Sequence, residues 1–377
     1  MKKIRVLHIL DELNTGGAER IVVNYFQNVN RELFQWDFVI TQYADIKKRG
    51  MLEDTVEKLG GHIYRVPRKR KNYIKNITET AKIIKNGNYD IVHSHLDELS
   101  ALYLFAAKKY KVPVRICHSH LAGAQRGRGV EIVCKISHPI MQKYTTDKFA
   151  CGIEAGKALW GNNAMENGEV YIMRNAIKTD KFHFDDEIRK KKRLELNVGE
   201  NTVYGTVGRL SYQKNSAFLI PIFTEIKKNN PHSVLAVVGE GELRAEMESM
   251  VKNAKLEDSV YFLGGREDVN ELMMAMDVFL LPSRFEGLPI VMVEAQCTGL
   301  TCLVSNQVTK EIKINPNVEY MSISESPGFW AKRCLSIYQL DNRESATKGI
   351  IEAGYEISNA AKELERYYLS ALSRRRP

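Results

Sequence analysis

Two acidic side chains lie eight positions apart in the stretch SRFEGLPIVMVEAQ, residues 283–296. The run DVFLLP before it is typical of a buried strand, and Pro289 is suited to the first turn of a helix. Glu286 is therefore expected in the loop before a helix, with Glu294 more than one turn inside that helix. A carboxylate within the apolar run IVMV needs a partner, either a ligand or a cation.

The chemistry open to this turn is the recognition of phosphate and hydroxyl groups. The flexible turn at Gly287 leaves the backbone N–H groups of Leu288 and Ile290 as donors for a departing phosphate. Glu286 beside them would accept hydrogen bonds from sugar hydroxyls, and Glu294, one layer deeper, those of a ribose. The alternative is structural: Glu286 caps the helix and Glu294 forms a salt bridge.

A second turn, VGRLSYQKN at 207–215, carries two cations just beyond a predicted strand. Arg209 and Lys214 are five residues apart, with the turn-forming Ser211 between them. Both could converge on one diphosphate in the crevice outside the carboxyl ends of parallel strands. The alternative interpretation is two unrelated surface charges.

Two glycine turns also follow predicted strands. Gly16 and Gly17, in LDELNTGGAERIV, open a helix near Ala18, where N–H groups and the helix dipole favour a phosphate or sugar oxygen. A plain tight turn is the alternative there. Gly239 and Gly241, in VVGEGEL, are a weaker indication of a turn that binds phosphate or ribose. Neither turn has the G-x-G-x-x-G spacing, so a dinucleotide cofactor is not expected.

Two His-Ser-His tripeptides, 93–95 and 118–120, also stand at the ends of predicted strands. Residues i and i+2 of a strand point the same way, so each pair offers two imidazoles on one face. Cysteine and carboxylate partners at zinc-ligand spacing are missing, which disfavours a metal site. His118 and His120 are instead expected to line a cleft and donate hydrogen bonds to a substrate. The alternative is ordinary polar residues at strand ends.

Short apolar runs alternate with helical patterns from end to end, which predicts an α/β chain with two doubly wound parallel-sheet domains. Strands are expected at 4–10, 36–42, 62–67, 90–95 and 114–120, and again at 202–210, 234–241, 260–265, 278–282 and 301–306. Helices are expected at 18–30, 72–86, 99–110, 216–229, 242–254, 268–276 and 289–298. The polar stretch 178–200 is the expected boundary, in keeping with a length of 377 residues.

The net positive charge of the chain arises entirely from its first half. Residues 1–185 contain 30 Lys and Arg against 20 Asp and Glu, and the remainder 25 (55 minus 30) against 26 (46 minus 20). Local peaks are RKRK at 68–71 and RGR at 126–128. This asymmetry indicates an anionic partner such as a lipid surface or a phosphorylated acceptor, or else a merely solvated face.

The chain is expected to remain in the cytoplasm. It contains no apolar run long enough to span a membrane, and the start MKKIRVLHILDEL is charged too soon for a signal peptide. Its six cysteines form no C-x-x-C pair, which suits reduced thiols.

Taken together, EGLPIVMVE, GRLSYQKN and NTGGAER resemble the motifs of the retaining family-4 glycosyltransferases, which have the GT-B fold. The resemblance extends over nearly the whole chain. It implies two Rossmann-like domains facing a central cleft: an acceptor-binding domain at 1–180, joined by a C-terminal helix at 359–377, and a nucleotide-sugar-binding domain at 181–358. The turn departs from glycogen synthases, which have Lys where this chain has Asn14.

The resemblance also implies roles for the residues that match it in the second domain. Arg209 and Lys214 would hold the donor diphosphate and neutralise it as it leaves, with no metal or cofactor. The lack of a D-x-D motif agrees with this expectation. Glu286 would bind the donor sugar and Glu294 the ribose. The loop FLGGRED would stack on the base, with Gly265 nearest.

Arg266 would share that loop's role. In the first domain, Gly16 and Gly17 would approach the phosphate and sugar, and either His118 or His120 would contact the sugar near the reacting carbon.

The implied reaction moves a hexose-type sugar, from UDP more often than GDP, to a glycan or polyprenyl-diphosphate-linked acceptor with retention of configuration. Capsule, exopolysaccharide or cell-wall glycan assembly in a bacterium is the expected setting, with peripheral contact to an anionic membrane. A sugar-nucleotide isomerase of the UDP-N-acetylglucosamine 2-epimerase type is an alternative, although this motif spacing is not its mark. A non-catalytic sugar-nucleotide-binding protein is another. A nucleic-acid partner is not expected, because basic stripes interleaved with aromatic residues are missing.

Overall fold

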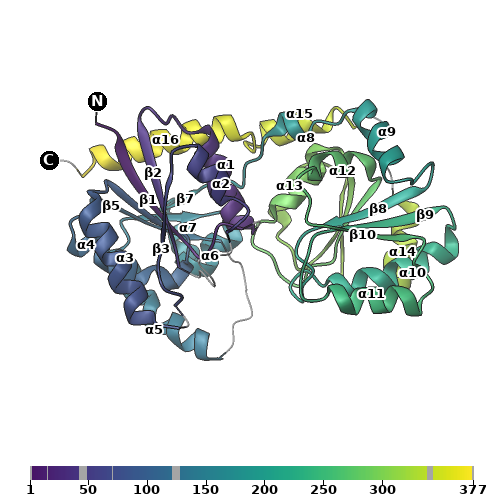
Figure 1. Ribbon diagram of the computed structural model, residues 1–377, viewed down its shortest axis with the longest axis horizontal. Helices are drawn as coiled ribbons and strands as arrows, with labels where there is room; N and C mark the ends of the chain where they lie inside the picture. The colour runs from purple at the N-terminus through teal and green to yellow at the C-terminus, as the bar shows by residue number, and fades with distance from the viewer. Residues whose placement is uncertain are drawn as a thin grey trace. The chain divides into compact units, whose positions relative to one another are not determined.

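The computed structural model describes residues 2–14, 16–41, 49–69, 71–120, 128–337 and 343–375. They form two compact units, each with its own parallel sheet covered by helices (Figure 1). Unit 1 comprises residues 1–176 and 357–377, and unit 2 comprises residues 177–356. The chain therefore leaves unit 1, completes unit 2 and returns.

Unit 1 is built on a parallel sheet with the strand order β3-β2-β1-β4-β5-β6-β7. Its strands are β1 (Ile4–Leu10), β2 (Phe34–Ile40), β3 (His62–Arg65), β4 (Ile91–Ser94), β5 (Val114–Ser119), β6 (Asp147–Ala150) and β7 (Val170–Ile172). Its helices are α1 (Gly17–Asn28), α2 (Glu53–Lys58), α3 (Tyr73–Gly87), η1 (Asp97–Ser100), α4 (Ala101–Lys109), α5 (Arg128–Tyr144), α6 (Ile153–Trp160), α7 (Asn162–Glu166) and α16 (Ile357–Ser373). Helix α16, yellow in Figure 1, packs on α1.

Unit 2 is also built on a parallel sheet, with the strand order β10-β9-β8-β11-β12-β13. Its strands are β8 (Thr202–Val207), β9 (Ser233–Val238), β10 (Val260–Gly264), β11 (Val278–Leu281), β12 (Thr301–Ser305) and β13 (Val318–Met321). Its helices are α8 (Thr179–Phe182), α9 (Asp186–Glu195), η2 (Ser216–Phe218), α10 (Leu219–Asn229), α11 (Arg244–Asn253), α12 (Val269–Ala275), α13 (Ile290–Cys297), η3 (Lys310–Ile312), α14 (Pro327–Ser336) and α15 (Ala346–Glu352). Both orders are those of doubly wound sheets.

Every strand expected from the sequence is present, and three short ones were not predicted. These are β6, β7 and β13, which are three or four residues long and lack a continuous apolar run. The polar stretch 178–200 is not a linker, because it folds as α8 and α9 and packs on α12. The two units meet in sequence at Ala176 and Ile177, and a bridge pairs Ile177 with Glu356, where the chain returns.

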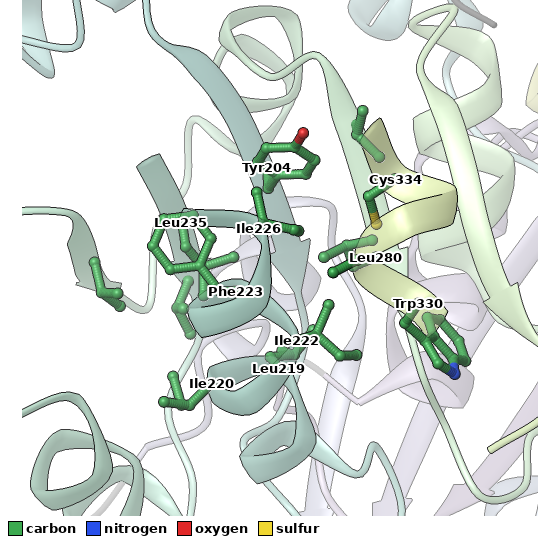
Figure 2. Packing of buried hydrophobic residues seen from close by; sticks show 14 of the residues in the cluster. Tyr204, Leu219, Ile220, Ile222, Phe223, Ile226, Leu235, Leu280, Trp330 and Cys334 are labelled. Carbon is green, nitrogen blue, oxygen red and sulfur yellow. The ribbon is translucent and has the colours of Figure 1, made fainter. Parts of the chain in front are cut away.

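Helix α10 shows how unit 2 obtains its core. Leu219, Ile222, Phe223 and Ile226 follow the i, i+3, i+4, i+7 spacing and are fully buried. Figure 2 shows these side chains in one cluster with Tyr204 and Leu280 of the sheet and Trp330 of α14. This packing holds the helices against the parallel sheet and so positions the loops at the strand ends.

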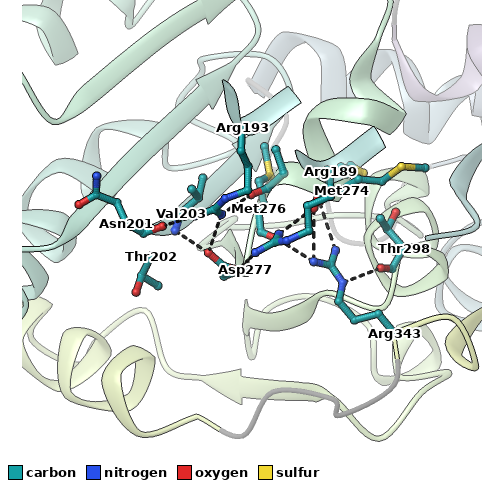
Figure 3. Close-up of polar contacts among 12 residues, drawn as sticks. Arg189, Arg193, Asn201, Thr202, Val203, Met274, Met276, Asp277, Thr298 and Arg343 are labelled. Carbon is teal, nitrogen blue, oxygen red and sulfur yellow. Dashed lines mark hydrogen bonds and ion pairs between the residues drawn. The ribbon is translucent and has the colours of Figure 1, made fainter. Parts of the chain in front are cut away.

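Three arginines fasten α9 and the segment before α15 to the centre of unit 2 (Figure 3). Arg189 and Arg193 bind the two carboxylate oxygens of Asp277, at 2.5 and 3.3 Å. Arg343 donates to the carbonyl oxygens of Met276, at 2.9 Å, and Thr298, at 3.0 Å. These bonds satisfy carbonyl groups at the ends of α12 and α13 that have no partner within the helices.

Candidate active site

The strand order of unit 2 reverses between β8 and β11, and the loops that follow these two strands carry the predicted catalytic residues. Such a switch point is where ligands bind in doubly wound sheets. The loops are tied together, since the backbone N–H of Arg284 donates to the Gln213 carbonyl at 2.8 Å. The Gln213 side chain donates in return to the Phe285 carbonyl at 3.2 Å.

Lys214 and Glu286 form an ion pair at this switch point, with 2.6 Å between Nζ and Oε1. The Ser283 hydroxyl donates to the same carboxylate oxygen at 2.9 Å. Glu286 is 8% exposed, so the pair is largely withdrawn from water. The Lys214 stem runs past Gly208, where a Cβ would lie 3.4 Å from the lysine Cε. The structure thus brings together two of the residues predicted from separate motifs.

Glu294 lies on α13, all eight residues of which are buried, and it is itself 2% exposed. The helix begins at Ile290 with Pro289 as its N-cap, one residue later than predicted. The Gly287 turn and Leu288 precede it, so Glu286 lies in the loop before the helix and Glu294 more than one turn inside it, as expected. The roles of the backbone N–H groups of Leu288 and Ile290 in binding phosphate remain predictions.

Arg209 does not share the environment of Lys214. Its side chain is 74% exposed, and its Nε donates to Glu242 at 3.2 Å. A surface ion pair of this kind contributes at most about 1 kcal/mol, so a diphosphate can compete for the guanidinium. In this structure the two cations have separate carboxylate partners.

The glycines after β9 have a structural reason for being glycine. A Cβ on Gly239 would lie 1.9 Å from the Gly208 carbonyl oxygen, and one on Gly241 2.1 Å from that of Leu210. The same backbones are joined by bonds from Gly208 N to Val238 O and from Leu210 N to Glu240 O, both 2.9 Å. This turn therefore packs directly under the loop that carries Arg209 and Lys214.

The residues expected to contact the base differ in their surroundings. Gly265 is exposed, with open space around the position of a Cβ. Arg266 donates to both oxygens of Asp268, at 2.8 and 2.7 Å, and to Glu195 at 3.2 Å. The hydrogen bonds that its guanidinium donates to Asp268 raise the pKa of Arg266 above its usual value. Its guanidinium is thus held in an ion-pair network, which sequence reasoning did not anticipate.

Unit 1 has its own switch point, between β1 and β4, and the glycine pair lies after β1. Gly16 is the N-cap of α1, and a Cβ there would lie 2.2 Å from Glu19 Oε2. Burial, with Glu12 and Asp11 nearby, raises the pKa of Glu19 to about 7. Because a carboxyl group already lies at this helix start, a sugar hydroxyl suits the site better than a phosphate, the other group expected there.

A cluster of five imidazoles fills the carboxyl end of the β1, β4 and β5 strands. Hydrogen bonds join His8 Nδ1 to His95 Nε2 at 3.1 Å, His95 Nδ1 to His120 Nε2 at 2.9 Å, and His93 Nε2 to His118 Nδ1 at 3.2 Å. Rings of neighbouring members stack, with centroids 4.0 Å apart for His118 and His120. The hydrogen bonds form two chains, His8–His95–His120 and His93–His118, and His118 and His120 meet through their stacked rings.

The far end of the His93–His118 chain fixes the tautomer of His118. The Tyr368 hydroxyl of α16 contacts His93 Nδ1 at 2.7 Å, and a buried phenol with one partner satisfies its O–H by donating. His93 then carries its proton on Nε2 and donates to His118 Nδ1. His118 is left with an Nε2–H group, which has no partner among the described residues. That nitrogen is itself buried, and His118 is fully buried whereas His120 is partly exposed, so of the two histidines expected to contact the sugar His120 is the one with exposed surface.

Burial keeps all five imidazoles neutral. It lowers the pKa of His8 to about 3 and that of His120 to about 4, and the pKa values of His93, His95 and His118 are also lowered, first by burial and then by one another. Two groups of three have ring nitrogens close enough to consider a metal ion. However, stacked rings aim their lone pairs alongside one another rather than at one point, and the nitrogens already bond each other. A hydrogen-bonded relay is the better interpretation.

Three residues of these sites were not identified from the sequence. Ser283 borders the quoted acidic motif, and a hydroxyl three residues before Glu286 was a usable signal. His8 is a polar residue inside the apolar strand IRVLHIL, which was a second signal. Tyr368 lies 275 positions from its partner His93, so no local pattern points to it.

Known proteins resemble this chain in sequence and in fold. The family described as glycosyl transferases group 1 matches residues 186–335, which include the ion pair and α13. A putative glycosyltransferase, EpsF of Bacillus subtilis, is 30% identical over 336 residues, covering 87% of this chain and 86% of that protein. The Escherichia coli UDP-Gal:alpha-D-GlcNAc-diphosphoundecaprenol alpha-1,3-galactosyltransferase is 28% identical, covering 81% and 80%.

Among solved structures, Anabaena Alr3699/HepE in complex with UDP superposes with a TM-score of 0.77 at 16% identity, covering 98% of this chain and all of that one. That similarity concerns the fold, which is GT-B. The EpsF match extends over both units, and the group 1 match covers the switch point where Lys214 meets Glu286. The chain therefore belongs to the group 1 glycosyltransferases and is an enzyme of that family.

Proposed function

We propose that the enzyme transfers a hexose-type sugar from a UDP-sugar to a lipid-linked sugar acceptor with retention of anomeric configuration. The observation that carries the proposal is the Lys214–Glu286–Ser283 cluster at the switch point of unit 2. A cation and a carboxylate held together in a largely buried environment can bind both parts of a sugar diphosphate. The cation suits the phosphate and the carboxylate suits the sugar hydroxyls.

In the proposed reaction, Lys214 moves its ion pairing from Glu286 toward the diphosphate as negative charge develops there. Arg209 leaves Glu242 and adds a second cation. Glu286, still bonded to Ser283, then accepts hydrogen bonds from hydroxyls of the sugar, and Glu294 accepts those of the ribose. No bound metal is called for, because the two cations do the neutralising.

Retention follows from a front-face displacement. The bond from the anomeric carbon to the phosphate oxygen breaks as the acceptor oxygen bonds the same face of that carbon. The acceptor proton passes to the departing phosphate oxygen, so atoms and charge balance without a protein base. A histidine of unit 1, the partly exposed His120 or else His118, would donate a ring N–H to a hydroxyl of the transferred sugar, and Gly16 and Gly17 would approach it with backbone groups.

The acceptor is inferred from a relative. The Escherichia coli enzyme named above acts, by its name, on a sugar linked to diphosphoundecaprenol. An acceptor of that class would place this enzyme peripherally at the inner face of the bacterial plasma membrane, in capsule, exopolysaccharide or cell-wall glycan assembly.

The decisive experiment measures which nucleotide-sugars protect the enzyme from thermal unfolding, and then follows product formation with a synthetic lipid-linked sugar. We expect a UDP-hexose to raise Tm. With the acceptor it should yield free UDP and a product whose new linkage has the same anomeric configuration, axial or equatorial, as the donor sugar. Activity should persist in EDTA. Inversion of the linkage, or conversion of the UDP-sugar to its epimer without transfer, would overturn the proposal; the latter result would favour the isomerase.

A further inference from the structure

The basic run at 68–71 is not simply a patch of surface charge. Lys69 within it is 8% exposed and pairs with Asp11 at 2.7 Å. Positions 70, 126 and 127 lie outside the described residues, and no helix in the described part of the chain is long and apolar enough to cross a membrane. Of the patterns that the sequence singled out in unit 1, the histidine pairs have the more fully defined contacts.

The hydrogen-bonded chain His8–His95–His120, which we call the His8 chain, leads from the core of unit 1 toward its surface. His8 on β1 is 0% exposed, His95 after β4 is 6% exposed, and His120 after β5 is partly exposed. Bonds of 3.1 and 2.9 Å join the three rings. The His95 backbone N–H donates to the Ile9 carbonyl at 3.0 Å, so the middle of the His8 chain is tied to β1.

The ring of His120 is held by three contacts. The backbone N–H of His120 donates to Asp97 Oδ1 at 3.1 Å, its Nε2 bonds His95, and its ring stacks on that of His118. The other ring nitrogen, Nδ1, has no partner among the described residues. Nδ1 of this fixed and partly exposed ring is therefore the atom of the His8 chain best placed to bind a ligand.

The protons of the His8 chain can be arranged in only two ways. Its imidazoles are neutral, because burial lowers their pKa values, and a neutral imidazole has one N–H and one lone pair. His95 bonds a ring on either side, so it donates one bond and accepts the other. All protons then point either outward, which leaves an N–H on His120 Nδ1, or inward, which leaves an N–H on His8 Nε2.

The surroundings of His8 favour the outward arrangement. His8 Nε2 is buried and has no partner among the described residues, and the Trp36 ring, 4.1 Å away between centroids, holds a second unbonded N–H. An inward arrangement would seal another N–H without an acceptor into this interior, and such orphaned donors are rare. The outward arrangement leaves a lone pair there and places the unbonded N–H on the partly exposed ring. The His93–His118 chain has no such choice, because Tyr368 and His118 are both buried.

We propose that His120 is the histidine that binds the transferred sugar, and that His8 and His95 are positioning residues that keep its Nδ1 a hydrogen-bond donor. The inference rests on the proposed function for the identity of the ligand. A neutral N–H on a fixed ring suits a sugar hydroxyl oxygen, and the partner of the second ring nitrogen determines which tautomer is presented. His8 would thus act on the sugar from two rings away, without touching it.

The first test is an NMR spectrum of the imidazole nitrogens in the full-length protein with isotopically labelled histidine and no ligand. We expect the proton of His120 on Nδ1. His8→Phe and His95→Leu should give mixed tautomers of His120, whereas His95→Asn, whose amide N–H can replace the donor to Nε2, should restore one. The matched control is Tyr368→Phe, which alters the other chain and should leave the His120 signals unchanged. Adding the UDP-hexose that raises Tm most should shift the His120 Nδ1–H resonance, and UDP alone should not.

The second test is kinetic. His120→Leu should lower kcat about 100-fold and His95→Leu about tenfold, each with an unchanged Kd of UDP, because the lost bond is made to the sugar. His95→Asn should recover most of the loss. His232→Gln, at an exposed position of unit 2, should change nothing.

Three results would overturn the proposal. A wild-type spectrum with the His120 proton on Nε2 would reverse the direction of the His8 chain. A His120 resonance that UDP shifts as much as the UDP-hexose does would remove the sugar contact. Equal kcat values for His95→Leu and His95→Asn, with circular dichroism showing both folded, would reduce His95 to a structural residue. A wild type that gives the expected spectrum but transfers no sugar would support the positioning role and count against the proposed function.

Discussion

Mild acid should unfold unit 1 because of its buried imidazoles. The folded pKa of His8 is about 3, far below the value of about 6.5 of an exposed histidine. A group whose folded pKa is lowered stabilises the fold above its unfolded pKa, and that stability is lost as pH falls toward the folded pKa. For His8 the free energy of unfolding at pH 5 is lower by about 2 kcal/mol than at neutral pH.

His120, whose folded pKa is about 4, shifts in the same direction, so these two imidazoles together remove about 4 kcal/mol by pH 5, and burial also lowers the pKa values of His93, His95 and His118. That loss compares with a total stability of about 5–15 kcal/mol for a domain. Glu19 acts in the opposite sense, because its raised pKa of about 7 lets the folded state take up a proton first. It offsets roughly one histidine, and the cluster dominates.

The assay is Tm by circular dichroism from pH 7.5 down to pH 4.5. We expect a steep fall in the Tm of one transition below pH 6. His8→Phe, between Trp36 and Phe38, should flatten that fall even if it lowers Tm at neutral pH. The control is His232→Gln, which changes an exposed histidine of unit 2. A Tm that stays constant to pH 4.5, or an acid transition that His8→Phe leaves as steep as before, would refute the reasoning.

Three further predictions concern the ion pair, the relay and the arginine anchor. Glu286→Ala should lower kcat about 100-fold or more, because the carboxylate is assigned to the sugar in the transition state. The Kd of UDP, measured calorimetrically, should change little. A comparable loss of UDP affinity would show that this role is wrong. Tyr368→Phe should give mixed tautomers of His93 and His118 in an NMR spectrum of the imidazole nitrogens. If His118 is the histidine that contacts the sugar, kcat should fall about tenfold with an unchanged KM for the donor, whereas an unchanged kcat would assign that contact to His120. Arg343→Met should lower the free energy of unfolding of unit 2 by about 3 kcal/mol in denaturant titrations, whereas Lys348→Met, at an exposed position on α15, should change it by less than about 0.5 kcal/mol.

The predicted strands and the acidic motif show what a single sequence can establish. Apolar runs such as IRVLHIL form β1 with the predicted limits, because a strand buried on both faces has a continuous apolar signature. The turn after β11 was likewise readable, since a proline, a glycine and two carboxylates have strong local preferences. Lys214 and Glu286 are expected to lie close together once their two loops are assigned to adjacent strands.

What could not be predicted depends on neighbours distant in sequence. Arg209 and Arg266 were both assigned to the donor from their place after strands. Their guanidinium groups are directed by carboxylates that include Glu242, 33 positions from Arg209, and Glu195, 71 positions from Arg266. Edge strands such as β7 and β13 are three and four residues long, and their pairing partners rather than their composition make them strands. The imidazole cluster could not be predicted because it depends on the register of three strands at once.

The return of the chain to unit 1 has a consequence for how the enzyme is made. Tyr368, which is fully buried and contacts Trp36 and His93, is synthesised after the whole of unit 2. A nascent chain that ends at residue 356 contains the whole of unit 2 but lacks the helix that seals the first sheet. Unit 2 can thus fold to completion during translation, whereas unit 1, although begun first, keeps apolar surface open to chaperones until α16 has been synthesised.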